Sequence, residues 1–521
     1  MGDDHVSAQT DAGAVRGARE GGVCVFRGIR YGADAGGHNR FRAPTSPRPW
    51  TEVRDALRFG PSAVQLQPGG GPARADDPLS VRNAGGEDCL VLNVWTPDTA
   101  GQRPVMVWFH GGGFTVGSAS GPLYDGAALA REGDVVVVSV NHRLGLLGYL
   151  QLDALFGDDY ADSGNAGVLD LVAALHWVKK NAARFGGDAG SVTIFGESGG
   201  GGKVCALLAA PRARGLFHRA IVQSGPPFQL PDLEQARRTA TEVLQRLELD
   251  PTRGPEPLLK LPPDRLLQVQ VEMGAGGGPS PGGMSFAPVI DRHVIDDWPE
   301  PALAAGAAAD VPLLIGTNLD EARFMLMMHR ELRKNPPELS AAELVERVSP
   351  GCDAGTADLV ASYQALYPEL SRFDLLLRIE SEQFRVRSIR LAEHRLQAAG
   401  APVYMYLLSW TTPRLAKYGA YHGLELPFLF GTLPTVPHLA ADPDAEALAR
   451  RIRQSWVAFA RDGVPAAEDV PTWTPYTTYE RATMRIDRSW SLEHDPMGDQ
   501  RAAWNGVPTG PTTRPWSRVI E

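Results

Sequence analysis

One short stretch, residues 191–202, constrains the fold of this chain more than any other. Strand-forming residues, Val192 to Phe195, run directly into GESGG at residues 196–200, which fits the pattern G-x-S-x-G. The apolar residues from Lys203 to Ala210 favour a helix. A strand, a tight turn and a helix in this order place the serine, Ser198, on an elbow above a parallel sheet. The glycines suit such a turn because it brings backbone segments close together and often requires a positive φ.

Two other interpretations of this stretch are available. An ordinary glycine-rich turn fits the motif taken alone, since G-x-S-x-G is short enough to occur by chance. A phosphate-binding loop fits less well, because Glu197 stands where that loop has its first glycine. Val204 follows Lys203 and offers no hydroxyl for magnesium, so we reject the phosphate-binding interpretation.

Composition narrows the class of protein. The 521 residues are 43% hydrophobic, and the net charge of −10 without a basic block argues against a nucleic-acid partner. No run of 18 apolar residues is long enough to span a membrane, and the polar residues 1–5 do not resemble a secretory signal. The four cysteines lie far apart without C-x-x-C spacing, which favours free thiols in a reducing compartment. We therefore expect a cytoplasmic protein.

Strands and helices alternate along most of the chain. This alternation predicts an α/β fold in which helices cover both sides of a large, mostly parallel sheet, and the nearly continuous apolar runs suit strands buried on both faces. We expect a single domain over residues 1–521, because no linker separates independent parts. The expected strands are 89–95, 105–109, 135–140, 192–195, 219–224, 312–316 and 403–408, and the expected helices are 167–184, 203–210, 231–247 and 444–462. We also expect an N-terminal hairpin at 14–31, a helical region at 340–400 inserted over the sheet and the active site, and loops at 60–86 and 274–284.

A serine nucleophile needs a base to take its proton and an acid to orient that base. In the α/β-hydrolase arrangement the acid and then the histidine follow the serine along the chain. Glu321 comes just after an expected strand, although a helix N-terminus would equally explain the pair Asp320 and Glu321. His422 lies in a loop after the strand 403–408, and the glycine run 111–113 after another strand offers backbone N–H groups to an oxyanion.

Several separate motifs together resemble the type-B carboxylesterases, the family that includes the cholinesterases. The resemblance runs from about Val15 to about Trp504. Its motifs are EDCLVLNV at 87–94, NHRLG at 141–145, FGGD at 185–188, FGESGG at 195–200 and GLFHRA at 215–220. The resemblance implies an α/β-hydrolase fold with no metal or organic cofactor.

The resemblance also implies roles for individual residues. Ser198 falls on the family's nucleophile, Glu321 on its acid and His422 on its base in an H-G-x-E-L-P segment. The oxyanion donors fall on Gly112, Gly113 and Gly199. Two buried structural ion pairs are implied, Arg40 with Glu87 and Arg143 with Asp170. Lys203, unusual so near the elbow, is expected to form a structural ion pair as well.

Most departures from the family pattern concern the substrate, and one concerns a disulfide. Gly282 and Met284 stand where relatives have bulky acyl-pocket residues, so the resemblance implies a roomy acyl pocket. Residues 64–86 lack the tryptophan with which cholinesterases hold a quaternary ammonium group. Cys89 has no evident upstream partner for the disulfide of secreted members. The other expected pocket residues are Phe114, Phe286, Phe324 and Met325.

We therefore expect a serine hydrolase that cleaves a small-molecule carboxylic ester through an acyl-enzyme. The same triad acting on an amide, carbamate or lactone, or in a biosynthetic acyl transfer or cyclisation, stays open. A non-enzymatic binding protein is the third alternative, but such relatives typically lose the serine and carry a membrane anchor. Neither a monomer nor a homodimer is favoured.

Overall fold

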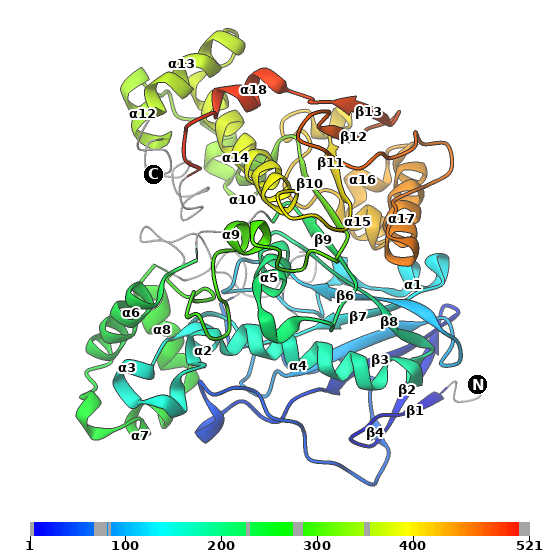
Figure 1. Cartoon of the computed structure of the whole chain (residues 1–521), viewed down its shortest axis with the longest axis vertical. Coiled ribbons are helices and arrows are strands. Elements are labelled where there is room, and N and C mark those ends of the chain that lie inside the picture. Colours follow the sequence, from blue (N-terminus) through cyan, green and yellow to red (C-terminus); the bar gives the residue numbers. More distant parts are fainter. Residues whose placement is uncertain are drawn as a thin grey trace.

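The computed structural model describes residues 5–66, 81, 85–225, 230–274, 285–348 and 355–509. Its described strands form one 13-stranded sheet that runs through the whole molecule (Figure 1). The order is β1-β2-β3-β5-β7-β6-β8-β9-β10-β11-β12-β13, and β4 pairs with β2. The strand bounds are β1 His5–Gln9, β2 Ala14–Glu20, β3 Val23–Arg30, β4 Arg54–Asp55, β5 Val91–Thr96, β6 Arg103–Phe109, β7 Val136–Val140, β8 Gly187–Glu197, β9 Arg219–Gln223, β10 Leu313–Asn318, β11 Val403–Leu408, β12 Ala482–Ile486 and β13 Ser491–His494.

The centre of the sheet is parallel and its margins are mostly antiparallel. All neighbours from β7 to β12 pair in parallel, whereas β1, β2, β3 and β5 form antiparallel pairs at one side and β13 at the other. The prediction of an α/β fold with a large, mostly parallel sheet is confirmed, as is the hairpin within residues 14–31. Because the carboxyl ends of parallel strands meet at one edge, residues that follow β6, β8, β10 and β11 are brought together there.

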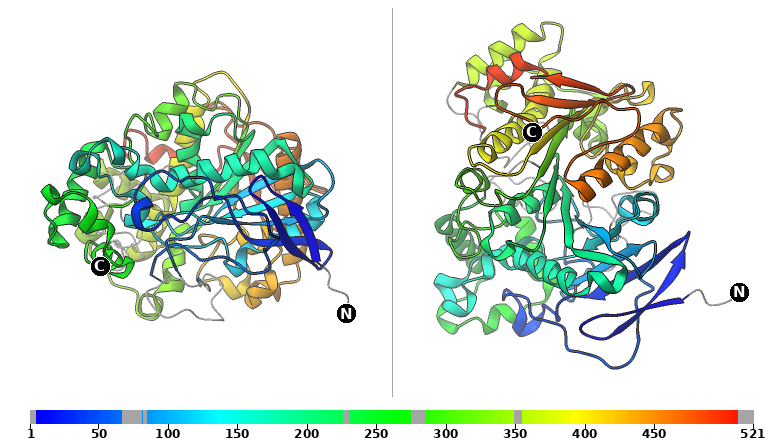
Figure 2. Two further views of the ribbon diagram at one scale, coloured as in Figure 1. Left: turned by 90° about the horizontal axis from the view of Figure 1, so that it is seen from below. Right: turned by 45° about the vertical axis from the view of Figure 1, so that its right-hand side comes forward.

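Helices cover both faces of the sheet, as β6 illustrates. Val105, Val107 and Phe109 pack in one apolar cluster with α4 (Ala166–Asn181) and α5 (Gly199–Ala209). Met106 and Trp108 alternate with them and pack with α1 (Ala127–Gly133) and α17 (Ala445–Asp462). Figure 2 shows α17, in orange, across the central strands from α4. Burial of each such side chain stabilises the folded state by about 1.5–3 kcal/mol. This burial fixes the register of the strand.

The expected helical region 340–400 is confirmed in the described residues. It comprises α12 (Ala341–Val348), α13 (Thr356–Leu366) and α14 (Arg372–Arg395), which share a third apolar cluster that includes Trp504. α14 also packs against α9 and β10, so it reaches the carboxyl edge of the sheet (Figure 1). The remaining helices are α2 Gly145–Tyr149, α3 Asp153–Phe156, α6 Leu233–Arg246, α7 Glu256–Leu259, α8 Pro263–Glu272, α9 Pro299–Ala304, α10 Phe324–Met328, α11 Arg330–Lys334, α15 Leu426–Leu429, α16 Pro437–Ala440 and α18 Gly498–Ala503.

The helix after the elbow begins at Gly199, earlier than the expected start at Lys203. Glycine has a poor helix propensity, but close packing explains why a run of glycines stands at this helix start. A Cβ at Gly200 would lie 2.0 Å from the Phe109 carbonyl oxygen, and one at Gly201 would lie 2.8 Å from Gly225 Cα. The first turn of α5 therefore fits against its neighbours only without side chains.

Both expected ion pairs are confirmed. Arg40 binds Glu87 through two hydrogen bonds of 2.6 Å, and Arg143 binds Asp170 through bonds of 2.6 and 2.8 Å. Cys24, Cys89 and Cys205 are buried free thiols, whereas Cys352 lies outside the described residues. The loop 274–284 beyond Gly274 and most of the loop 60–86 also lie outside them. Within the described ranges, no helix is both long and apolar enough to cross a membrane.

Candidate active site

Ser198 occupies a strained elbow between β8 and α5. Its φ of 57° and ψ of −125° lie in a region that costs a non-glycine residue about 1–3 kcal/mol. Neighbouring backbone holds this geometry, since Ser198 N donates to the Gln223 carbonyl at 2.9 Å and Gly202 N donates to the Ser198 carbonyl at 3.0 Å. The residue is partly exposed although its neighbours Glu197 and Gly199 are buried. The strand–turn–helix context expected from the sequence is confirmed.

The glycine run after β6 lies against the elbow. Gly112 and Gly113 have φ values of 92° and 62°, which favour glycine. A Cβ built on Gly199 would lie 2.5 Å from both the nitrogen and the Cα of Gly113. The chain thus brings the backbone of Gly113, at the end of one strand, against that of Gly199, at the end of another.

His422 and Glu321 are hydrogen-bonded. Nδ1 of His422 lies 2.5 Å from Oε2 of Glu321, and because the carboxylate accepts, Nδ1 carries the proton. Glu321 is fully buried, and its Oε1 accepts from the backbone N–H of Asn318 at 2.8 Å. Ser381 of α14 steadies the turn that follows, because its Oγ accepts from the N–H of Ala322 at 3.0 Å. The helical region therefore helps to hold the carboxylate in place.

Asp320 and Glu321 do stand at a helix N-terminus, as the helix-terminus interpretation expects: Asp320 is the N-cap residue of the short turn Glu321–Arg323, and Glu321 is its first residue. The Asp320 side chain nevertheless makes no capping hydrogen bond to that turn. One oxygen instead accepts from Arg378 Nη2 at 3.2 Å and the other from the N–H of Ala420 at 3.1 Å. Asp320 thus ties the loop that carries His422 to the end of β10.

A second carboxylate faces His422 from the other side. Oε1 of the buried Glu197 lies 3.1 Å from Nε2 of His422. Burial raises the pKa of Glu197 to about 8, against the attraction of His422. Burial alone would lower the pKa of His422, but Glu197 and Glu321 outweigh it and raise that pKa to about 9. Two groups so close titrate as a pair. Sequence reasoning missed Glu197 because it occupies the unspecified x of G-x-S-x-G.

A third buried carboxylate, Glu425, fixes the loop around His422. Its oxygens accept from Asn318 Nδ2 at 2.8 Å and Gln223 Nε2 at 3.2 Å, and burial raises its pKa. Asn318 also donates to the Tyr421 carbonyl at 2.8 Å. Glu425 is the glutamate of the H-G-x-E-L-P segment, so the sequence did carry a signal for it.

Two aromatic rings adjoin His422. The ring centroids of Phe324 and Phe384 lie 5.9 and 5.4 Å from that of the imidazole. Phe324 was expected at the pocket. Phe384 of α14 was missed because the expectation of a helical region over the sheet does not say which of its side chains reach the imidazole. The structure buries Phe114 and Phe286 in the main core and packs Met325 among α12–α14. Gly282 and Met284 lie outside the described residues.

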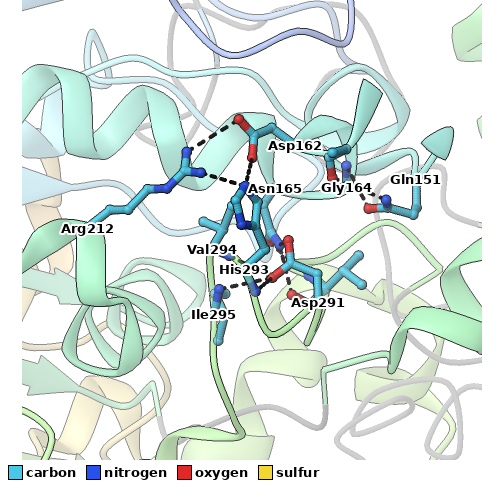
Figure 3. Close-up of polar contacts among 11 residues, drawn as sticks. Gln151, Asp162, Gly164, Asn165, Arg212, Asp291, His293, Val294 and Ile295 are labelled. Carbon is cyan, nitrogen blue, oxygen red and sulfur yellow. Dashed lines mark hydrogen bonds and ion pairs between the residues drawn. The ribbon is translucent and has the colours of Figure 1, made fainter. Parts of the chain in front are cut away.

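The segment after the expected acyl-pocket loop is anchored to the start of α4. Asp291 Oδ1 accepts from the backbone N–H groups of His293, Val294 and Ile295 at 3.0, 2.8 and 3.1 Å (Figure 3). Its Oδ2 accepts from Asn165 Nδ2 at 2.9 Å. The contacts of Asp162 with Arg212 and His293, drawn in the same figure, are partly exposed. They therefore contribute little to the stability of the fold.

Comparison with known proteins decides the family. The model of the carboxylesterase family matches residues 4–504. The chain belongs to the carboxylesterase family. Its resemblance to the type-B carboxylesterases is thereby confirmed, and with it the expectation of a carboxylic ester hydrolase.

The relatives of this carboxylesterase match over nearly their full length. It is 35% identical to the para-nitrobenzyl esterase of Bacillus subtilis, covering 95% of this chain and 98% of the relative. It is 35% identical to the phenmedipham hydrolase of Pseudarthrobacter oxydans, covering 92% and 94%. A crystal structure of a Geobacillus stearothermophilus carboxylesterase superposes with a TM-score of 0.83 at 37% identity, covering 96% of this chain and 99% of that one.

Proposed function

We propose that this carboxylesterase works through an acyl-enzyme, with Ser198 as nucleophile, His422 as base and Glu321 as acid. The observation that carries the proposal is the 2.5 Å contact between Glu321 Oε2 and His422 Nδ1, two residues 101 positions apart in the chain. Such a bond fixes the tautomer in which Nε2 accepts a proton, and it stabilises the imidazolium that forms. The strained elbow and partial exposure of Ser198 support its role.

The chemistry follows from these groups. Ser198 Oγ attacks the substrate carbonyl while His422 Nε2 takes its proton, and the protonated imidazole then protonates the leaving alcohol. Water then attacks the acyl-enzyme while His422 takes its proton, and the protonated imidazole returns that proton to Ser198 as the carboxylic acid is released. The proposed oxyanion donors are the backbone N–H groups of Gly112, Gly113 and Gly199, and each such donor contributes about 3 kcal/mol in the transition state.

The natural substrate is a small molecule whose acyl and alcohol groups are open. Relatives of similar identity are named for different substrates: para-nitrobenzyl esterase, phenmedipham hydrolase, medium-chain fatty acyl-CoA hydrolase and fumonisin B1 esterase. We propose a roomy acyl pocket formed by Gly282 and Met284, with Phe324 near the imidazole. Amides, carbamates and lactones, or a biosynthetic acyl transfer or cyclisation, are the alternative substrates and reactions of the same triad.

We further propose that residues 1–521 form one α/β-hydrolase domain, supported by the continuous sheet from β1 to β13 and by the family match over residues 4–504. A cytoplasmic location remains a prediction, supported by the buried free thiols of Cys24, Cys89 and Cys205.

The test combines variants with direct observation of the intermediate. Ser198→Ala should lose nearly all turnover of a para-nitrophenyl ester while staying folded, and Glu321→Gln should lower kcat by about 10⁴-fold, as a misplaced tautomer does. Wild-type enzyme quenched during turnover should carry the acyl group on the peptide that contains Ser198. Ser191→Ala, in the middle of the same strand β8, is the matched serine control. A folded, active Ser198→Ala enzyme would end the proposal.

A further inference from the structure

Lys203 is a buried lysine on the helix that begins at the proposed nucleophile. It lies on α5, and its side chain is 1% exposed. The sequence led us to expect a structural ion pair, and that expectation is wrong: among the described residues, Lys203 has no carboxylate within ion-pair distance. Its Nζ instead donates to the carbonyl oxygen of His110 at 2.8 Å.

The contacts of Lys203 bracket the glycine run of the proposed oxyanion hole. His110 is the residue immediately before Gly111, and Phe114 is the residue immediately after Gly113. Nζ of Lys203 binds the carbonyl of the first and lies 5.9 Å from the ring centroid of the second. One side chain thus touches both ends of the loop from the helix that supplies Gly199.

The side chain of His110 is held in place by its neighbours. The His110 ring stacks on His142 with centroids 5.0 Å apart and planes at 9°. Nδ1 of His110 lies 2.9 Å from the Gly111 carbonyl oxygen, so Nδ1 carries the proton and donates. Burial, and then the Lys203 charge, lower the pKa of both histidines, which keeps the rings neutral. The lysine therefore binds the carbonyl of a residue whose side chain is itself anchored.

Holding an amine at this position costs the protein stability. Burial lowers the pKa of Lys203 to about 7, and the attraction of Glu197 opposes that shift. A buried charge that lacks an ion-pair partner is destabilising, and an apolar side chain of the same volume is often neutral or better. A residue that costs stability beside a catalytic loop is a candidate for a functional role.

We infer that Lys203 is a positioning residue for the oxyanion hole: its Nζ ties the loop 110–114 to α5 and so fixes Gly112 and Gly113 relative to Gly199. The inference rests on the proposed function and adds to it a residue that touches neither substrate nor the reacting atoms. The hydrogen bond is available from the neutral amine as well as from the ammonium, because both carry N–H donors.

The test is Lys203→Met, which keeps the side-chain volume and removes the donor. With para-nitrophenyl butyrate, kcat per active site should fall by about ten- to hundredfold, the range expected when a catalytic group shifts by about an ångström. KM should stay within about threefold. The melting temperature should be unchanged or higher, because a buried amine is replaced by an apolar group. A trifluoromethyl ketone, whose adduct with a serine carries an oxyanion, should bind more weakly by a factor similar to that in kcat.

Two further variants separate positioning from stability. Lys203→Gln retains an N–H donor on a slightly shorter side chain and should recover part of the lost kcat. Leu208→Ala makes a cavity in the same helix, and it should lower the melting temperature without changing kcat per active site.

Three outcomes would overturn the inference. One is a Lys203→Met enzyme with kcat within about twofold of wild type. Another is a loss of kcat that Leu208→Ala reproduces at an equal loss of stability. The third is failure of both Lys203 variants to fold, which would assign the lysine to stability alone. If Ser198→Ala retained wild-type activity, the proposed function itself would fail, and that result is distinguishable from all three.

Discussion

Glu197→Gln should move the pH dependence of this carboxylesterase toward acid. Glu197 Oε1 lies 3.1 Å from His422 Nε2, the atom that must be free of a proton to accept one from Ser198. The negative charge of Glu197 favours imidazolium and raises the pKa of His422. Removing that charge lowers this pKa, so neutral imidazole persists to lower pH. The acid limb of kcat/KM reports the pKa of this base in the free enzyme, so the limb should shift to lower pH with it.

The size of the shift follows from the geometry. At 3.1 Å and an effective dielectric constant of about 20, two unit charges attract by about 5 kcal/mol, equivalent to about four pKa units. That value is a ceiling, because Glu197 itself keeps its proton up to about pH 8 and a neutral acid attracts little. An opposite charge at this range shifts a pKa by about 1–3 units. We expect a shift of that size, from a wild-type limb above the ordinary histidine value of about 6.5.

The assay is kcat/KM for a neutral ester between about pH 5 and 10, in wild type and Glu197→Gln. Glu425→Gln is the matched control, since it makes the same chemical change at the carboxylate with the smallest effect on His422. It should shift the limb less. A limb that stays in place in folded Glu197→Gln enzyme, or that moves upward, would refute the reasoning. Equal shifts in both variants would assign the effect to net charge and not to the 3.1 Å contact.

Three further predictions follow from other parts of the molecule. Asp170→Asn leaves the 4%-exposed Arg143 without its counter-charge and should lower the free energy of unfolding by about 3–5 kcal/mol in denaturant titrations; a loss below about 1 kcal/mol would contradict this. Wild type should accept hexanoyl and benzoyl esters in preference to acetyl in kcat/KM, and Gly282→Phe should reverse the order; an acetyl preference unchanged by phenylalanine would exclude this loop from the pocket. Mass mapping should find every cysteine reduced, and a bridge to Cys89 would overturn the predicted thiol state.

Much of the fold could be predicted because its signals are local. The apolar runs at 105–109, 219–224 and 403–408 fall on β6, β9 and β11, since strands buried on both faces need continuous apolar sequence. Motifs of a few residues identified the family, because the elbow around Ser198 tolerates only glycine at its closest approaches. The marginal strands β12 and β13 were missed, since they are short and only partly apolar.

The sequence by itself determined the family, the parallel core of the sheet and the candidates Ser198, Glu321 and His422. The tertiary structure alone decided which side chains surround the imidazole. Glu197 faces Nε2, Phe384 packs beside the ring, and Lys203 binds a backbone carbonyl instead of a carboxylate. These contacts join residues from different strand ends and from a helix that packs over the sheet. They depend on the register of β6, β8, β10 and β11 and on how α14 docks, which no local pattern of residues encodes.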